Sequence, residues 1–377
     1  MHDKLRALLT LFILQIMALV SISMGHEVSI CLPLMVQLTP LFSHCGLSYL
    51  GCITGTDVDK TKGILFEECV EEEYVNEMSC FSLARHGACL VVIWGHISNA
   101  VSESAKRDLS DLKNTLRINQ EQRWQSIVTL KNIFSCSDLP WELKKQGMDF
   151  LLGITESGGA SAGSTKEPVD SSHYITSLYG ALQSIEILMM SAPDAALRKN
   201  AYEAMKRILA DITPSHRLDV MKALITSSRA SSMTALLINL VREEMHKEQK
   251  RVNGEISPGE NGTFWSNSGI LEIVENVLRP QGGPPSVLED SDAVLSALNL
   301  YRYILLTEHN GKSNRTGVLS ETNLRRAYDE WLLPLRTLVT ALMADDDVSV
   351  EYSCGLNPLE LVLYRCIELV EEQLKNP

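Results

Sequence analysis

The sequence predicts an all-α protein built as an irregular solenoid of stacked antiparallel helix pairs. Apolar residues recur at helical spacing along most of the chain, whose hydrophobic content is 45% with only 6% aromatic residues. No stretch shows sustained alternation of β-branched and polar residues between tight turns, so we expect no sheet. One helix outline also recurs along the chain, as in proteins made of stacked helical repeats.

Helices are expected wherever this spacing is clear, and several begin at ordinary start signals. Thr213-Pro214 and Asn357-Pro358 place proline at the first helical position, and Ser286 with Glu289 has the spacing of a capping box. The predicted helices cover 3–24, 28–43, 64–76, 79–101, 105–117, 121–135, 139–154, 173–191, 194–211, 215–228, 230–250, 268–279, 287–308, 321–343 and 358–375.

The recurring outline is clearest in "SAPDAALRKNAYEAMKRILADI" (191–212). Proline and aspartate open this helix, a basic residue follows, and small alanines allow close helix contact, which resembles the second helix of a HEAT repeat. The segment "CSDLPWELKKQGMDFLLGI" (136–154) repeats the outline. Without the Gly/Ser stretch between them, the two are separated by nearly the ~40–47 residues of a HEAT or armadillo unit. The predicted fold is therefore a HEAT/armadillo-like α-solenoid.

A Gly- and Ser-rich stretch, "TESGGASAGSTKEPVDSS" (155–172), divides the predicted helices into two groups. Its composition is that of a flexible linker. We therefore predict a front HEAT-like array over 1–154, a linker over 155–172, and a C-terminal HEAT-like array over 173–377 that binds a partner.

Charge and motifs argue against several functional classes. The net charge of −13 opposes nucleic-acid binding, which depends on clustered Lys and Arg. The sequence has no phosphate-binding loop, dinucleotide fingerprint, His-Glu-x-x-His motif or nucleophile elbow. Its nine cysteines include no Cys-x-x-Cys pair. We therefore expect a protein that is not an enzyme, with no catalytic residues, no cofactor and no metal.

The N-terminal segment "LRALLTLFILQIMALVSISM" (5–24) allows two interpretations. It could be a signal peptide or membrane anchor, which would make the protein secreted or membrane-anchored. However, Gln15 interrupts it, it has no clear small-residue cleavage site, and it is barely long enough to span a membrane. We favour a buried solenoid helix and no membrane association.

The helix predicted over 287–308 follows a Gly/Pro hinge, "RPQGGPP" (279–285), and is apolar on more than one side. Its main stripe consists of Val294, Leu298, Tyr301 and Leu305. Leu300 and Tyr303 lie nearly opposite this stripe, which an isolated surface helix would not allow. We therefore expect this helix to be enclosed by neighbours or to present its far side to a partner.

Three segments of the C-terminal part resemble the glomulin family, and within it the plant branch. They are "GGPPSVLEDSDAVLSALNLYRYILLTEHNGKSNRTGVL", "YDEWLLPLRTLV" and "LVLYRCIELVEEQL". The resemblance is specific over roughly residues 265–377 and follows the helix pattern alone before that. Family members are longer, so the resemblance implies that this chain lacks part of the N-terminal array.

The resemblance implies an irregular HEAT-like solenoid that regulates ubiquitination without chemistry of its own. Glomulin-type proteins bind the RING subunit of cullin-RING (SCF) ubiquitin ligases and block docking of the ubiquitin-conjugating enzyme. The plant branch implies a role in lateral root initiation. We further expect a monomer in the nucleus or cytoplasm. The residues predicted to contact the partner are Asn299, Arg302, Tyr303, Arg325, Arg326 and Trp331.

Two other functions remain open from the sequence. One is a general HEAT-repeat scaffold or transport adaptor, which the same helical array would serve. The other is the secreted or membrane-anchored protein that the N-terminal segment would allow.

Overall fold

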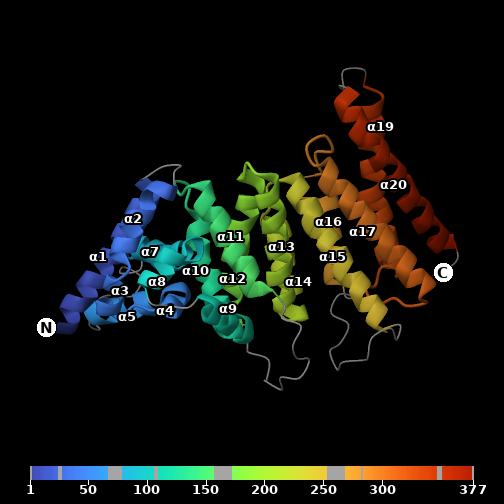
Figure 1. Ribbon diagram of the computed structural model, residues 1–377. Helices are drawn as coiled ribbons and strands as arrows, with labels where there is room; N and C mark the ends of the chain where they lie inside the picture. The colour runs from blue at the N-terminus through green and yellow to red at the C-terminus, as the bar shows by residue number, and fades with distance from the viewer. Residues whose placement is uncertain are drawn as a thin grey trace. The chain divides into compact units, whose positions relative to one another are not determined.

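The computed structural model describes residues 2–23, 28–66, 79–105, 109–156, 172–252, 268–281, 283–345 and 350–375. Every regular element within these ranges is a helix, so the all-α prediction is confirmed there (Figure 1). The helices form two compact units, Met1–Ile212 and Thr213–Pro377.

The first unit contains helices from α1 to α13. Their bounds are α1 His2–Ser23, α2 Val28–Leu38, α3 Leu41–Cys45, α4 Tyr49–Thr54, α5 Thr56–Leu65, α7 Ser79–Ile97, α8 Asn99–Ser104, α9 Leu109–Ile118, α10 Gln120–Ser135, α11 Trp141–Thr155, α12 Ser172–Ser191 and α13 Ala195–Asp211. Most predicted helices are found within a few residues of these bounds. The helix predicted over 64–76 lies mostly outside the described residues.

The second unit contains the remaining helices. They are α14 Pro214–Ser227, α15 Ser231–Val252, α16 Gly269–Leu278, α17 Ser291–Asn310, α18 Glu321–Arg326, the π-helix η1 Ala327–Leu332, α19 Leu333–Met343 and α20 Val350–Lys375. Within this unit α17 contacts α15, α16 and α20. The unit is therefore organised around α17.

The division into units falls after Ile212, whereas the sequence analysis placed it at 155–172. The reason is packing, because α12 lies against α10 and α13 lies against both α11 and α12. Residues 157–171 lie outside the described residues, so the flexible linker itself stays a prediction.

A charged network attaches the end of α13 to the start of α10. The Asp211 carboxylate accepts hydrogen bonds from Arg123 Nε at 2.9 Å and Arg123 Nη2 at 2.8 Å. It also accepts one from Nε1 of the fully buried Trp124 at 2.9 Å. Charge-assisted, two-pronged contacts of this kind fix geometry as well as adding stability. The network explains why α13 belongs with the first unit.

The helices α1 and α7 approach so closely that a side chain would not fit between them. A Cβ atom on Gly87 would lie 1.8 Å from the carbonyl oxygen of Leu14. Further along the same pair of helices, Trp94 Nε1 donates a hydrogen bond to Ser21 Oγ at 2.9 Å. Glycine at position 87 therefore sets how close these two apolar helices can lie.

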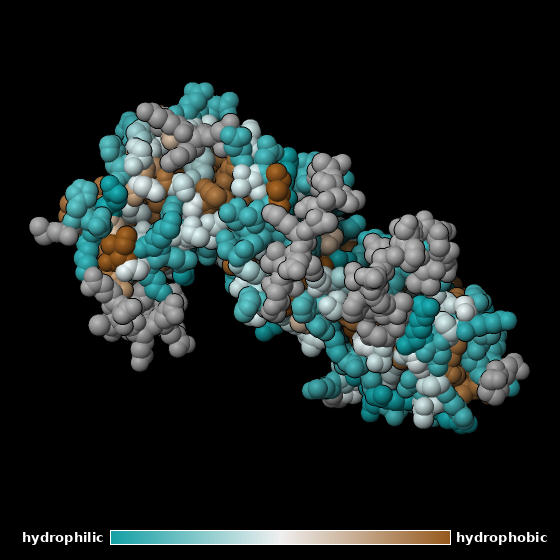
Figure 2. Space-filling view, turned by 90° about the horizontal axis from the view of Figure 1, so that it is seen from below, coloured by the Kyte–Doolittle hydropathy of each residue, from teal (hydrophilic) through white to brown (hydrophobic). Residues whose placement is uncertain are grey.

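The apolar character of α1 is only partly explained by burial. Within the described residues, α1 and the segment Cys80–Ile97 of α7 are long and apolar enough to cross a membrane. In the most apolar part of α1, 39% is buried, and in the segment of α7, 61% is buried. The exposed apolar residues of α1 are Leu5, Leu8, Leu9, Phe12 and Leu19. On the face seen in Figure 2, apolar residues form separate patches on a mostly hydrophilic surface. The predicted burial of this helix therefore holds for one side only, and the absence of a membrane stays a prediction.

Two predicted helix starts are wrong. Ser286 and Glu289 do not form a capping box, because the Ser286 carbonyl accepts from the backbone N–H of Glu289 in a turn and α17 begins only at Ser291. Pro358 does not start a helix, because α20 runs through it from Val350. Leu356 and Leu359, on either side of this proline, are buried, and their packing offsets the cost of proline inside a helix.

The helix predicted over 321–343 changes its winding in the middle. Here α18, η1 and α19 follow one another without a break, and η1 is wound as a π-helix. Pro334, in the first turn of α19, has no N–H to donate to the carbonyl of Glu330. A local widening of the helix is a common response to such a missing hydrogen bond.

We expect the substitution Gly87→Ala to destabilise the protein by about 3 kcal/mol or more, because its methyl group would overlap the Leu14 carbonyl. A methyl group added at Gly63, in α5, would meet nothing within 4 Å, so Gly63→Ala should stabilise by about 0.5–1 kcal/mol. Urea denaturation of both variants measures the difference. Equal stabilities would contradict the close contact of α1 with α7.

Two histidines should make opposite contributions to acid sensitivity. Burial and then the charge of Lys113 lower the pKa of His96 to about 4, and Lys113 Nζ lies 3.3 Å from His96 Nδ1. Below its ordinary pKa of about 6.5, the unfolded chain binds a proton that folded His96 does not, so stability falls with pH down to about 4. A hydrogen bond with Cys136 raises the pKa of His86, so its contribution is present at low pH and is lost as pH rises through the raised pKa.

Urea midpoints measured near pH 7 and pH 5 test both contributions. His96→Gln should reduce the acid-induced loss of stability, whereas His86→Gln should enlarge it, because each variant removes a contribution of opposite sign. Changes of the same sign in the two variants would contradict this assignment.

Candidate functional site

The strongest candidate for a functional site lies along α17, whose sequence divides it into a buried part and a narrow polar strip. The stripe of Val294, Leu298, Tyr301 and Leu305 is buried, as predicted. Leu300, on another side, is also fully buried. The enclosure predicted for this helix is therefore confirmed. The strip that remains is formed by Asn299, Arg302, Tyr303 and Leu306, at the i, i+3, i+4 and i+7 spacing of one helix face.

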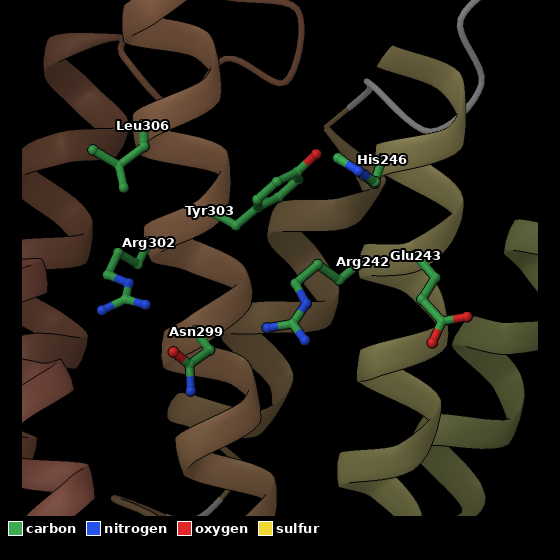
Figure 3. Close-up of a pocket in the computed structure, with 7 residues that line it drawn as sticks. All are labelled: Arg242, Glu243, His246, Asn299, Arg302, Tyr303 and Leu306. Atoms are coloured by element: carbon green, nitrogen blue, oxygen red, sulfur yellow. The ribbon is translucent and has the colours of Figure 1, made fainter. Parts of the chain in front are cut away.

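This strip faces α15 across a groove with a cavity volume of about 330 Å³. Figure 3 shows the side chains that line it. They are Arg242, Glu243 and His246 from α15, and Asn299, Arg302, Tyr303 and Leu306 from α17. The structure thus brings together three of the six residues that the sequence predicted to contact a partner. We call this surface the α15–α17 groove.

Hydrogen bonds position the two helices beside the groove. The Ser231 hydroxyl, at the start of α15, accepts from the backbone N–H of Ala293 at 3.1 Å, at the start of α17. Further along, the Tyr303 hydroxyl donates to Gln249 Oε1 at 3.0 Å. The two helices therefore run in the same direction, with the groove along their contact.

The Tyr303 ring forms the centre of the groove. It packs edge-on against the His246 ring, with 6.4 Å between centroids. Burial raises the pKa of the Tyr303 phenol above its ordinary value, and the guanidinium of Arg242 opposes this shift. The phenol therefore stays neutral at physiological pH and acts as a packing surface and hydrogen-bond donor.

The other three predicted contact residues do not line the groove. Arg325 forms an ion pair with Glu321 at 2.8 Å, one turn away on the same exposed helix. Trp331 is only 4% exposed, and its ring packs edge-on against Tyr301 at 5.8 Å. Trp331 is therefore a core residue and not the surface anchor that the sequence suggested.

Arg326 belongs to a closed cluster of two arginines and two glutamates. It pairs with Glu275 and lies 3.6 Å from Glu330, while Arg279 pairs with Glu330 and lies 3.8 Å from Glu275. This cluster borders a second cavity of about 550 Å³ between α16, the Gly/Pro hinge and η1. Because its four charges neutralise one another, the cluster links α16 to η1 rather than offering free charge to a partner.

Sequence reasoning missed the side of the groove that α15 supplies. Arg242, Glu243 and His246 stand in the segment "VREEMHKEQK" (241–250), whose charges are those of an ordinary solvated helix face. Nothing in their spacing indicates that they meet residues nearly sixty positions later. Only the parallel packing of α15 on α17 brings them together.

The part of the chain that the structure describes contains no group of three or more His, Cys, Asp or Glu residues that could hold a metal ion. The groove combines arginine, glutamate, histidine, amide, tyrosine and leucine side chains. Such a set of side chains is suited to binding another molecule.

Comparisons with known proteins identify a family and several relatives. A family described as "Uncharacterised protein family, YAP/Alf4/glomulin" matches residues 164–366. Aberrant root formation protein 4 of Arabidopsis thaliana is 43% identical over 388 aligned positions, which cover 99% of this chain and 60% of that protein. Human glomulin is 23% identical over 41% of this chain and 24% of its own length. Mouse glomulin is 22% identical over 43% of this chain.

The chain spans about 60% of the length of its Arabidopsis relative and about a quarter of the human and mouse glomulins. The family match over 164–366 includes every residue that lines the α15–α17 groove.

We expect Arg326→Ala to lower the free energy of unfolding by about 1 kcal/mol, because it leaves Glu275 and Glu330 without one of their partners. Arg325→Ala is a matched control, since its exposed pair with Glu321 should contribute less than about 0.5 kcal/mol. Urea denaturation compares the two. A larger effect for Arg325→Ala would contradict the cluster.

Proposed function

Because the chain belongs to the YAP/Alf4/glomulin family, we propose that it is a non-enzymatic, protein-binding regulator of ubiquitination. It binds the RING subunit of a cullin-RING (SCF) ubiquitin ligase and blocks docking of the ubiquitin-conjugating enzyme. The family match carries this proposal, because the matched residues include the whole α15–α17 groove. The similarity to aberrant root formation protein 4 further supports a role in lateral root formation.

The proposed architecture is an irregular HEAT-like solenoid, which suits this mechanism. Successive helices pack mainly on near neighbours in the chain, such as α12 on α13 and α15 on α17. Rigid helical surfaces can cover a docking site without chemistry, and specific complexes bury on the order of 1,200–2,000 Å² with a few anchors that dominate the affinity. In this proposal the protein acts as a monomer in the nucleus or cytoplasm.

Three residues of the α15–α17 groove are the proposed contacts. Tyr303 and Arg302 belong to the residue types that most often dominate binding energy, and Asn299 lies beside them with a polar amide. Leu306, which is 37% exposed, adds apolar surface next to them. Arg325 and Arg326 are already paired within the chain and lie outside the groove, so they are not among the proposed contacts.

A ubiquitin-chain assay with a purified cullin–RING pair tests the proposal. Adding this chain should slow chain formation, and the double variant Arg302→Glu/Tyr303→Ala should bind the RING subunit at least about tenfold more weakly, as expected when interface anchors are lost. Arg325→Glu, which changes the same charge outside the groove, should still inhibit. Thermal melting checks that both variants remain folded.

If the unaltered protein neither binds the RING subunit nor slows chain formation, the proposed function is wrong. Binding of the RING subunit without slower chain formation would instead favour a scaffold or adaptor that uses the same α15–α17 groove.

A further inference from the structure

The α15–α17 groove carries unpaired positive charge in a chain whose net charge is −13. Arg242 and Arg302 are both half-buried, and neither forms an ion pair with a carboxylate of the described residues. Three other arginines of the same unit are paired: Arg217 with Glu244, Arg279 with Glu330, and Arg326 with Glu275. The chain has 47 acidic and 34 basic residues, so carboxylates are abundant. A shortage of carboxylates therefore does not explain why Arg242 and Arg302 have no carboxylate partner among the described residues.

The directions of the side chains keep this positive charge available. Figure 3 shows Arg242 reaching from α15 toward α17 and ending near the Asn299 amide. Arg302 lies on the other side of Asn299, while the Glu243 carboxylate points away from α17. Among the described residues that line the groove, Glu243 alone has a carboxylate, and no ion pair joins it to Arg242 or Arg302. An occupant that crosses the exposed face of α17 would meet one guanidinium on each side of Asn299.

An apolar surface adjoins the two guanidinium groups. Leu306 is 37% exposed, although α17 is buried on its other sides. The Tyr303 ring is held beside it by the hydroxyl contact with Gln249 and the edge-on contact with His246. The groove thus combines two positive charges with an aromatic and an aliphatic side chain. Arginine and aromatic residues are the types that most often dominate binding energy at protein interfaces.

We propose that the α15–α17 groove binds an acidic segment of a partner protein. Carboxylates of the segment pair with Arg242 and Arg302, and a neighbouring apolar side chain packs on Leu306 and Tyr303. The planar guanidinium matches a carboxylate with two parallel hydrogen bonds, and partial burial strengthens such pairs. This inference rests on the proposed function, for which it names the chemistry of the docking segment.

A protein segment fits the groove better than a nucleic acid. Binding to a phosphate backbone requires many Lys and Arg residues along its path, because affinity comes from the release of several counterions. The groove offers two arginines and one histidine, with Glu243 beside them, in a chain that repels polyanions overall. A short acidic segment with an apolar residue needs only what these side chains supply.

Fluorescence polarisation with the full chain tests the inference. The probe is a short fluorescein-labelled peptide of glutamate and leucine residues, and its control has glutamine in place of each glutamate. The acidic peptide should bind the unaltered protein at least about tenfold more tightly than the glutamine peptide, and added salt should weaken it, since the contact is electrostatic.

Two double variants separate the groove from general charge effects. Arg242→Glu/Arg302→Glu should lose at least about tenfold in affinity for the acidic peptide, because both proposed pairs become repulsive. Arg325→Glu/Arg365→Glu makes the same change in net charge at exposed ion pairs outside the groove, and it should bind normally. Arg242→Lys/Arg302→Lys should keep an intermediate affinity, because charge remains while the two-pronged geometry is lost.

Each further outcome decides between alternatives. Equal binding of the acidic and glutamine peptides, or equal losses in the two glutamate variants, would overturn the inference. A labelled RNA oligonucleotide that binds tightly and loses affinity only in the groove variant would overturn it in favour of nucleic acid.

Binding of the RING subunit in parallel distinguishes this inference from the proposed function. Acidic-peptide binding at the groove without RING binding would remove the proposed function and leave the inference. Equal RING binding by the unaltered protein and the Arg242→Glu/Arg302→Glu variant would keep the function and overturn the inference.

Discussion

The enclosure of α17 by three neighbouring helices is the constraint on which the second unit depends. Because α17 contacts α15, α16 and α20, apolar residues must occupy more than one of its sides, and Leu298 and Leu300 are both fully buried. Only a narrow strip is left for polar residues. That strip, from Asn299 to Leu306, becomes one wall of the α15–α17 groove. The packing that stabilises the unit therefore also determines where the groove lies.

Charge is distributed unevenly over this acidic chain. Arginines at structural contacts are paired, as Arg123 is with Asp211 in the first unit and Arg326 is with Glu275 in the second. Such pairs link helices that are distant in sequence and leave little charge for a partner. Arg242 and Arg302 differ because no carboxylate of the described residues pairs with them. Arginine thus links helices where a carboxylate lies opposite, and it is available for the proposed recognition where none does.

The family relationship and the α15–α17 groove rest on different observations. The comparisons place the chain in the YAP/Alf4/glomulin family and match the segment that holds the groove. The groove itself follows from side chains, burial and charge in this chain alone. The first unit, with the glycine contact between α1 and α7 and a partly exposed apolar helix, lies mostly outside that match, although the Arabidopsis relative aligns over nearly all of it.

The sequence by itself determined the all-α class, most helix positions, the buried stripe of α17 and the family, because these depend on local periodicity and on contiguous motifs. It also selected Asn299, Arg302 and Tyr303 as partner contacts; the structure brings these three to one groove, and their contact with a partner stays a prediction. Tertiary structure alone decided that Trp331 is buried, that α20 continues through Pro358, and that Arg242 and His246 complete the groove. These outcomes depend on which distant helices pack together. The spacing of apolar residues within one helix shows which of its sides are buried but does not identify the helices that bury them.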